Sequence, residues 1–345
     1  MRAVRFDGEF LRVATNAADP LLAPGEALVH PTRVLIGPAD LTAVVPGSAT
    51  RHVGVVGHQF VGVVKRVNVP DDAGPLQIAR KKLVGKRVVG SPLLVCTHCD
   101  MCRAGLPSHC RARKVMGLAT RDGCFADLFA IPLSNLVEVP PAMTDERAVF
   151  AHLASSAVQA GQMLRAASKS YISVIGDSPL AMLTAQALAR HNRTTRLLYT
   201  RPECAKLCER WGMKCRGVEE PGRRQDQDVV IECSGTTAGL TLALKLVRPR
   251  GMVVLKSGAA GVPYPPGYTL ERADASLAVD LMPAIANEIQ LLGCREASIA
   301  DGLGALTDSA VEIDTLIGRR FAMDDAISAY AAAAQNPCCS VVMEV

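Results

Sequence analysis

SYISVIGDSPLA, residues 170–181, decides the fold of this chain. Its first six residues are mostly apolar and long enough for a buried strand, and Gly176 then permits a tight turn. The Ala- and Leu-rich stretch from Leu180 to Arg190 is typical of a helix. A strand, a glycine turn and a helix in this order indicate the start of a βαβ unit with a parallel sheet.

The same alternation continues toward the C-terminus. We expect strands at 196–199, 228–232, 252–255 and 289–292, and helices around 203–210 and 240–246. Strands that alternate with helices predict an α/β fold with a doubly wound parallel sheet.

The first 150 residues have a different texture. Gly, Pro and Asp separate short apolar runs such as 27–29, 53–56 and 61–64, which are typical of a β-rich domain. A helix is expected at 324–334 and a terminal strand at 340–345. A length of 345 residues agrees with about two domains.

Four cysteines interrupt the β-rich part with the spacing C-x2-C-x2-C-x7-C: Cys96, Cys99, Cys102 and Cys110. Four thiolates about 2.3 Å from a tetrahedral Zn²⁺ make a closed structural site. Disulfides are one alternative, although the remaining cysteines have no pairing pattern. A [4Fe–4S] cluster is another, but ferredoxin motifs place the fourth cysteine sooner and follow it with Pro, where this chain has Arg111. The spacing favours structural zinc.

The turn after the first expected α/β strand resembles a dinucleotide fingerprint, G-x-G-x-x-G/A. Gly176 takes the first position and Ala181 is an allowed residue at the third. Ser178 replaces the middle glycine, and its Cβ would crowd a pyrophosphate. The strand, turn and helix context therefore favours a nucleotide site, with Ser178 as its departure.

The end of the second α/β strand bears on the kind of dinucleotide. NAD-binding chains carry an acidic residue there for the ribose, whereas this chain reads Tyr199-Thr200-Arg201. Arg201, with help from Arg193 or Arg196, could accept the 2′-phosphate of NADP. A surface arginine that opens a helix is the alternative, and if a cofactor binds, NADP is favoured over NAD.

Composition excludes some partners. The chain has 38 Lys and Arg, 33 Asp and Glu and a formal net charge of +5, which zinc held by four thiolates would reduce to about +3. This balance gives no reason to expect nucleic acid. We interpret the one basic cluster, Arg80, Lys81, Lys82, Lys86 and Arg87, as a solvated turn.

Compartment is also indicated by the sequence. No apolar run approaches the length of a membrane span, and the first residues lack the apolar region of a secretory signal. Twelve cysteines without a disulfide pattern suit a reducing cytoplasm. We expect a cytoplasmic protein with no membrane partner.

Several segments together resemble the medium-chain zinc alcohol dehydrogenases over nearly the whole chain. They are the cysteine loop, the nucleotide turn, GHQFVG at 57–62, GKRV at 85–88, Ser234-Gly235 and RPRGMVVLKS at 248–257. The resemblance implies a GroES-like β-rich catalytic domain, 1–150 with 296–345, that carries a structural zinc lobe at about 94–112. It further implies a Rossmann coenzyme domain at 151–295, with Ser234 near the cofactor, a small-molecule substrate and a homodimer or homotetramer.

Enzymes of this family typically hold a second, catalytic zinc, and here the resemblance breaks. The C-x-[ST]-D segment aligns with Gly37-Pro38-Ala39-Asp40, which has lost the thiolate and the relay hydroxyl. His58 remains, but Gln59 replaces the neighbouring Glu and Ala151 replaces the third ligand. Because a catalytic zinc needs about three protein ligands, one imidazole cannot hold it.

His58, Asp40 and His152 remain as candidate catalytic residues. Asp40 resembles the acid that orients the zinc-bound histidine, although a lone Asp–His pair in a cleft is more often structural. His152 follows the lost ligand and could join His58 in a rewired zinc site; the alternative is a helix histidine near the cleft wall.

Three functional hypotheses follow. The first is an alcohol dehydrogenase-like NAD(P)-dependent oxidoreductase for alcohols, aldehydes or ketones that works without catalytic zinc. The second is a zinc enzyme with rewired ligands. The third is a non-catalytic nucleotide-binding or scaffold member of the family that keeps only the structural zinc.

Overall fold

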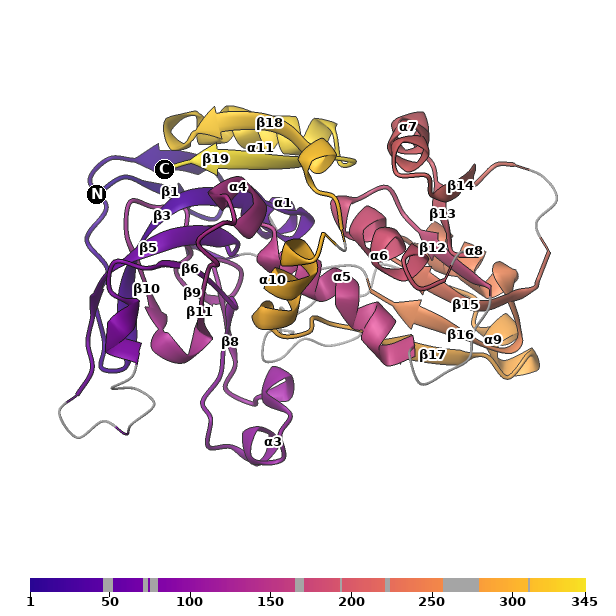
Figure 1. Cartoon of the computed structure of the whole chain (residues 1–345), viewed down its shortest axis with the longest axis horizontal. Coiled ribbons are helices and arrows are strands. Elements are labelled where there is room, and N and C mark those ends of the chain that lie inside the picture. Colours follow the sequence, from indigo (N-terminus) through magenta and orange to yellow (C-terminus); the bar gives the residue numbers. More distant parts are fainter. Residues whose placement is uncertain are drawn as a thin grey trace.

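The computed structural model describes residues 1–45, 52–70, 74, 80–164, 171–192, 194–220, 224–256, 279–309 and 311–345. Two lobes are visible in Figure 1, a β-rich lobe with both chain termini and an α/β lobe. Ser170, Arg193 and Ser257, which the sequence singled out, lie outside the described residues.

The β-rich lobe is built on a sheet that joins the two ends of the chain. Its strands follow the order β11 (Leu136–Glu138), β6 (Arg87–Gly90), β5 (Phe60–Val67), β3 (Glu26–Ile36), β19 (Ser340–Glu344) and β18 (Ile317–Ala322), and β10 (Phe129–Pro132) also pairs with β3. Two small sheets join β2 (Leu11–Ala14), β1 (Ala3–Phe6) and β4 (Gly54–Val55), and β7 (Leu93–Leu94), β8 (Lys114–Met116) and β9 (Thr120–Arg121). The expected strands at 27–29 and 61–64 lie in β3 and β5, and the one at 53–56 shortens to β4.

The α/β lobe contains the predicted parallel sheet. Its six strands follow the order β14 (Lys214–Gly217), β13 (Arg196–Tyr199), β12 (Ile172–Ile175), β15 (Gln227–Glu232), β16 (Val247–Leu255) and β17 (Gln290–Gly293). Every pairing in it is parallel. The chain reverses direction across the sheet between β12 and β15, and a doubly wound sheet binds its ligands beside such a switch point.

Helices cover the sheets and connect the lobes. The β-rich lobe has α1 (Pro38–Ala43), α3 (Asp100–Arg103) and α11 (Ala326–Gln335), and α4 (Asp145–Ala148), α5 (Ala151–Leu164) and α10 (Ile299–Thr307) lie toward the middle of Figure 1. The α/β lobe has α6 (Pro179–Ala189), α7 (Pro202–Arg210), α8 (Thr237–Leu246) and α9 (Met282–Ala286). In the part of the chain that the structure describes, no helix is long and apolar enough to cross a membrane.

Some element boundaries differ from the prediction for local reasons. Helix α8 begins at Thr237 rather than 240, because the Thr236 hydroxyl accepts a hydrogen bond from the Gly239 N–H and caps the helix. Strand β16 begins at Val247 rather than at 252, and it includes Pro249 and Gly251. Strand β14 has no apolar run (KCRG) and was therefore missed.

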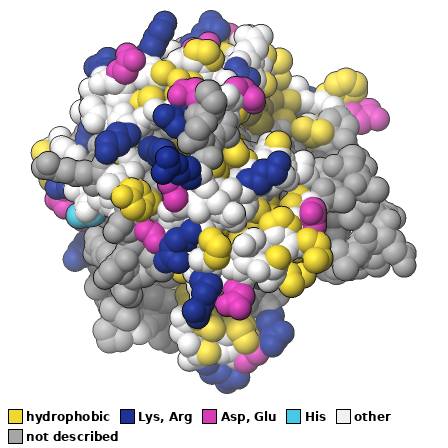
Figure 2. Space-filling view, turned by 90° about the vertical axis from the view of Figure 1, so that its right-hand side faces the viewer, with side chains coloured by type: hydrophobic (Ala, Val, Ile, Leu, Met, Phe, Trp, Pro, Cys, Tyr) yellow, Lys and Arg dark blue, Asp and Glu magenta, His cyan; other side chains and the backbone are white. Residues whose placement is uncertain are grey.

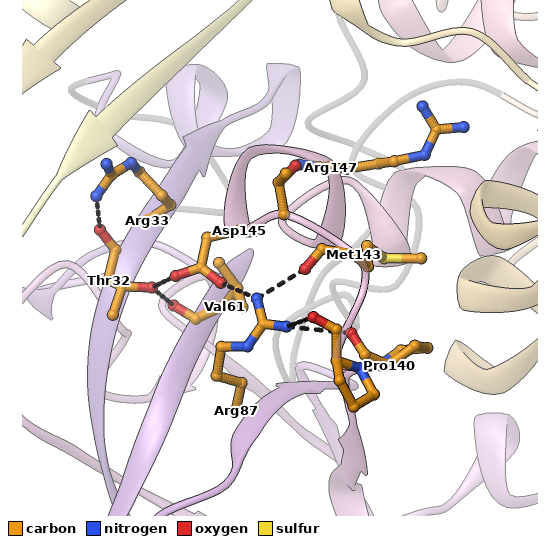
Figure 3. A network of polar contacts seen from close by, with 10 residues as sticks. Thr32, Arg33, Val61, Arg87, Pro140, Met143, Asp145 and Arg147 are labelled. Atoms are coloured by element: carbon orange, nitrogen blue, oxygen red, sulfur yellow. Dashed lines mark hydrogen bonds and ion pairs between the residues drawn. The ribbon is translucent and has the colours of Figure 1, made fainter.

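Arg87 ties β6 to the segment that leads into the α/β lobe (Figure 3). Its guanidinium donates to Asp145 Oδ1 at 2.8 Å and to the carbonyl oxygens of Met143, Pro140 and Pro141 at 2.7–3.1 Å. Asp145 Oδ2 also accepts a 2.5 Å hydrogen bond from Thr32 Oγ1 on β3. The interpretation of Arg87 as part of a solvated turn is therefore wrong, because its charge is paired and half-buried.

One of the hydrophobic clusters contains residues of both lobes. Leu35 and Val61 of the β-rich sheet belong to the same buried cluster as Val174 and Ile231 of the parallel sheet. Helix α5 contributes buried residues such as Ala154 to this cluster. The lobes are therefore joined by packed apolar surface as well as by the chain itself.

Candidate active site, zinc lobe and coenzyme turn

The four predicted metal ligands lie together between β7 and β8. The Sγ atom of Cys110 is 3.5 Å from that of Cys96 and 3.9 Å from that of Cys99, and all four ligand atoms, with Cys102, lie within 4.8 Å of one another. A tetrahedral zinc with Zn–S bonds of about 2.3 Å separates its sulfur atoms by about 3.8 Å. The quartet therefore fits a zinc ion.

Local hydrogen bonds prepare these thiols for a cation. The backbone N–H groups of Cys96 and Cys99 donate to the sulfurs of Cys110 and Cys96 at 3.3 and 3.4 Å. The backbone N–H of Cys102 lowers the pKa of Cys99 to about 6, whereas loss of hydration raises the pKa of Cys102 to about 12. Four thiols crowded together cannot all ionise alone, and a divalent cation removes that repulsion.

The second predicted constellation, His58 with Asp40, is also assembled. Nδ1 of His58 lies 2.7 Å from Asp40 Oδ1, and both side chains are buried. Asp40 Oδ2 accepts a 2.8 Å hydrogen bond from the Gly37 N–H at the start of α1. The carboxylate thus caps a helix and orients the imidazole, which places the proton on Nδ1 and leaves Nε2 for other partners.

A tight turn before β5 delivers His58 to this position. Gly57 has φ +94°, a conformation that favours glycine. A Cβ on Gly57 would lie 2.0 Å from the ring of Phe125, so a larger residue would collide with the core. The glycine that precedes His58 is therefore required by packing, independent of any ligand.

Gly37 and Ala151, at the other positions of the expected catalytic zinc site, cannot bind a metal with their side chains. A Cβ on Gly37 would lie 2.6 Å from Nε2 of buried Gln59, so Gln59 takes the space beside Gly37. Ala39 and Ala151 offer no side-chain donor atom. These residues do not fit a second zinc, and among the described residues only the cysteine quartet brings three or more ligand atoms together.

His152, at the start of α5, lies near His58 as the sequence suggested. The two ring centroids are 5.5 Å apart and the ring planes are nearly perpendicular. Within the described ranges Nδ1 of His152 is buried without a hydrogen-bond partner. Loss of hydration, and then the neighbouring His58, lowers the pKa of His152 to about 4, so its ring is neutral at pH 7. Among the described residues, His58, His152 and Asp40 do not form a group that brings three ligand atoms together, so the geometry does not support the rewired zinc site.

The nucleotide turn has the geometry expected of its glycine. Gly176 has φ +140°, and a Cβ there would lie 3.2 Å from both the Cβ of Ala181 and the backbone of Cys233. Helix α6 can therefore pack against the sheet only with small residues at 176 and 181. Both residues thus serve the close strand–helix contact of a dinucleotide turn.

The start of α6 already uses some of its anion-binding groups. The Ser178 hydroxyl accepts a 3.3 Å hydrogen bond from the Ala181 N–H, and Pro179 at the first helical position has no N–H. Ser178 is therefore a helix cap as well as a departure from the fingerprint. Fewer backbone donors are left for a pyrophosphate than a glycine-rich turn supplies.

Asp177 was missed by the sequence reasoning. Its Oδ1 accepts hydrogen bonds from the backbone N–H groups of Thr200 at 2.8 Å and Arg201 at 3.3 Å, and its Oδ2 accepts one from the Thr200 hydroxyl. The carboxylate therefore lies at the end of β13, where the ribose or 2′-phosphate of a dinucleotide is expected. Its position within the Gly176–Ala181 turn could have indicated a role at the nucleotide site.

The three predicted arginines differ in availability. The Arg201 side chain is exposed at the start of α7, next to the Asp177 contact. Arg196 does not assist it, because its Nε donates to Ser173 Oγ at 3.0 Å inside the sheet. Arg193 is outside the described residues, so Arg201 is the described cation at this strand end.

Ser234 follows β15 but is occupied locally. Its backbone N–H donates to Glu232 Oε1 at 2.6 Å, and its hydroxyl hydrogen-bonds the same carboxylate and Thr236. The Gly235 N–H also donates to Glu232. The carboxylate thus shapes the loop at the carboxyl end of β15.

Lys256 was quoted within a motif but given no role. It is 1% exposed at the carboxyl end of β16, and its Nζ donates to the Arg295 carbonyl at 2.6 Å and contacts Cys294 Sγ at 3.3 Å. Its charge also lowers the pKa of His152, but less than burial, His58 and Arg295 do. A lysine directly after an apolar strand is unusual, and this position could have indicated that Lys256 is buried.

Comparison with known proteins identifies a domain of this chain and its overall fold. Residues 23–141 match the alcohol dehydrogenase GroES-like domain. An L-threonine 3-dehydrogenase from Vibrio cholerae serotype O1 is 24% identical over 287 residues, which cover 79% of this chain and 76% of the relative.

Two solved structures extend the likeness to the whole chain. The alcohol dehydrogenase TADH from Thermus sp. ATN1 is 24% identical with a TM-score of 0.78 and full coverage of both chains. A protein from Sinorhizobium meliloti 1021, described as a zinc-binding dehydrogenase bound to NADP, is 22% identical with a TM-score of 0.79 and covers 100% of this chain and 99% of its own. The GroES-like and Rossmann fold prediction is confirmed.

Proposed function

We propose that this chain is an alcohol dehydrogenase-like, NAD(P)-dependent oxidoreductase without catalytic zinc, which the GroES-like domain match, the threonine dehydrogenase relatives and the shared fold support. Its substrates are small alcohols, aldehydes or ketones. The observation that carries the proposal is the assembled His58–Asp40 pair beside Gln59, which takes the space next to Gly37. The site keeps an orienting acid and an imidazole but has lost the ligands of a metal.

The zinc in the cysteine lobe has a structural role in this proposal. Cys96, Cys99, Cys102 and Cys110 supply four ligands, which fill a tetrahedral site and leave no position for substrate. The lobe has little apolar packing of its own, since α3 and the short helix Pro107–His109 bury none of their residues; its other ties are the Arg111–Asp100 ion pair and a hydrogen bond from Arg295 to the Ser108 carbonyl.

His58 provides the proton transfer. Asp40 accepts a hydrogen bond from Nδ1, so the proton exchanged with a substrate oxygen is on Nε2. A donor at Nε2 polarises a carbonyl, and the same atom accepts the proton when an alcohol is oxidised. His152, neutral at pH 7, lies 5.5 Å from His58 between ring centroids and adds no charge beside it. When bound, the nicotinamide supplies or accepts the hydride.

The dinucleotide would be held by Gly176, the start of α6 and the end of β13. Arg201 favours NADP over NAD, because its exposed guanidinium can pair with a 2′-phosphate. Asp177 opposes that preference. Its carboxylate accepts hydrogen bonds from the backbone N–H groups of Thr200 and Arg201, so its negative charge would repel a 2′-phosphate at this strand end. We therefore expect NADP to be preferred over NAD by a small factor only.

A specific observation also favours the non-catalytic alternative. Backbone N–H groups that a dinucleotide would use are already hydrogen-bonded: that of Thr200 donates to Asp177, and that of Ala181 donates to the Ser178 hydroxyl. Pro179, at the first position of α6, has no N–H to offer. If these contacts persist, the chain keeps the family fold as a scaffold or weak nucleotide sensor.

Metal analysis and nucleotide titration separate these functions. We expect one zinc per chain, micromolar binding of NADPH, and carbonyl reduction that is lost in His58→Gln and strongly reduced in Asp40→Asn. Two zincs per chain would contradict the zinc-free mechanism. One zinc with no binding of NADPH or NADH would leave the scaffold function.

We further propose that the chain forms a homodimer through the β17 edge of the parallel sheet. Leu291 and Leu292 of this edge strand are each 37% exposed, and Met282 and Ile285 of neighbouring α9 are 61% and 70% exposed. Hydrophobic side chains are visible among Lys and Arg on the face seen in Figure 2. Light scattering should report a dimer, and Leu292→Lys should shift it to the monomer. A wild-type monomer at micromolar concentration would contradict this.

A further inference from the structure

Two cysteines from distant parts of the chain meet where the lobes face each other. Cys204 in the first turn of α7 and Cys338 in the loop before β19 have their Sγ atoms 3.1 Å apart. Both side chains are buried, with 0% and 1% exposure. The loop that carries Cys338 lies on the side of the β-rich lobe that faces α7 (Figure 1). Sulfur atoms closer than van der Waals contact need little movement to bond.

The same pair touches the coenzyme turn. Cys204 Sγ lies 3.5 Å from Asp177 Oδ1 and 3.9 Å from the Asp177 carbonyl oxygen. Asp177 in turn holds the backbone of Thr200 and Arg201. A change at Cys204 therefore reaches the strand end at which a dinucleotide would bind.

We propose that Cys204 and Cys338 are a reversible disulfide site that ties the α/β lobe to the β-rich lobe beside the turn that contains Asp177. The pair is separate from the zinc ligands, and its two members lie 134 residues apart. A peroxide or a low-molecular-weight disulfide is the oxidant class.

The chemistry with hydrogen peroxide balances in two steps. The Cys338 thiolate attacks one peroxide oxygen, the O–O bond breaks, and the products are a sulfenic acid and hydroxide, which takes a proton to become water. Cys204 sulfur then attacks the sulfenic sulfur, the S–O bond breaks and a second water leaves with the thiol proton. Two thiols are oxidised by two electrons and one peroxide is reduced to two waters.

The two sulfurs are unequal, as this sequence of steps needs. Either sulfur can donate the hydrogen bond between them, but a carboxylate oxygen of Asp177 lies 3.5 Å from Cys204 Sγ and disfavours a thiolate at Cys204. Cys338 is thus the attacking thiolate and Cys204 the resolving thiol. Cys339, next in the chain and half-buried, is the competitor to exclude.

Peptide mapping of the zinc-loaded wild-type protein tests the site directly. After treatment with peroxide we expect one cross-linked peptide pair that contains Cys204 and Cys338, reversible by dithiothreitol. The covalent loop should raise the unfolding midpoint by roughly 5 °C or more. Cys204→Ser and Cys338→Ser should abolish both effects, whereas Cys339→Ser and Cys215→Ser should retain them. Free thiols at 204 and 338 after oxidation, or a bond from Cys338 to Cys339, would overturn the proposal.

Dinucleotide exchange provides a second readout, which rests on the proposed function. Because release needs space between the lobes, NADPH should leave the oxidised protein at least about threefold more slowly than the reduced protein in stopped-flow fluorescence. Equal release rates would overturn the role in exchange. If the reduced protein binds no dinucleotide, the proposed function fails while the mapped disulfide is unaffected.

Discussion

The cysteine lobe and the His58 site differ in what supports them when no metal is bound. The lobe has little apolar interior, since its short helices bury no residue, and its main internal contacts are four sulfur atoms that meet and an exposed Asp100–Arg111 ion pair. His58 instead follows a turn packed on Phe125 and is held by Asp40, within the core of the β-rich lobe. A metal site that is packed within a hydrophobic core can lose its ligands and keep its shape. A lobe with almost no apolar interior is expected to unfold when its metal is lost.

Removing one thiol from the lobe gives the largest expected effect. Cys99→Ser should remove the zinc, which contributes on the order of 10 kcal/mol of binding linked to folding. We expect zinc content to fall from one per chain to near zero, with early local unfolding seen by hydrogen exchange at 94–112. Cys215→Ser, outside the quartet, is the matched control. Unchanged protection of 94–112 in Cys99→Ser would mean that the lobe does have a core of its own.

Adding a thiol to the other site tests the converse. Gly37→Cys should bind no second zinc and should lower the free energy of unfolding by about 1–3 kcal/mol, because its Cβ meets Gln59 Nε2 at 2.6 Å. Gln59→Ala in the same chain should relieve most of that cost, which a double-mutant cycle in urea would measure. Additive costs would show that Gln59 does not fill the space beside Gly37.

Acid should reveal the lowered pKa of the His152 imidazole. The pKa of His152 in the folded chain is about 4, below its usual 6.5, so the unfolded chain binds more protons between these values. Stability should therefore fall as the pH drops from about 6.5 to about 4, by roughly 1–3 kcal/mol. His152→Gln should flatten this part of the profile measured in urea. If stability falls equally with pH in the wild type and in His152→Gln, another titrating group causes the loss.

Asp177 gives the smallest effect. Asp177→Asn removes one negative charge near the 2′-phosphate position and should tighten NADPH binding by about fivefold, the size of a roughly 1 kcal/mol repulsion in water. NADH, which lacks that phosphate, should change less. An equal gain for both dinucleotides in fluorescence titrations would indicate that Asp177 acts by filling space rather than by charge.

The sequence predicted the fold and the cysteine lobe because both depend on local patterns. Apolar runs placed β12 and β13, and cysteine spacing alone brought four ligands into one loop. The meeting of His58, Asp40 and His152 came instead from a family resemblance, since these residues lie on three separate elements.

What sequence reasoning missed depends on contacts between distant residues. Asp177 lies in an expected turn, but its contact with Thr200 requires the order of β12 and β13 in space. Lys256 ends a strand that was predicted, yet its burial depends on Cys294 after the next strand. Arg87 was misread because a basic run looks solvated until its carbonyl partners are placed.

The shared core between the lobes has a consequence for how this protein denatures. Leu35 and Val61 pack in one cluster with Val174 and Ile231, so the two lobes cannot separate without exposing apolar surface of both sheets. We therefore expect one calorimetric transition for the bulk of the chain, with equal van 't Hoff and calorimetric enthalpies. The cysteine lobe, which lies outside that cluster, should melt as a separate unit once its zinc is chelated.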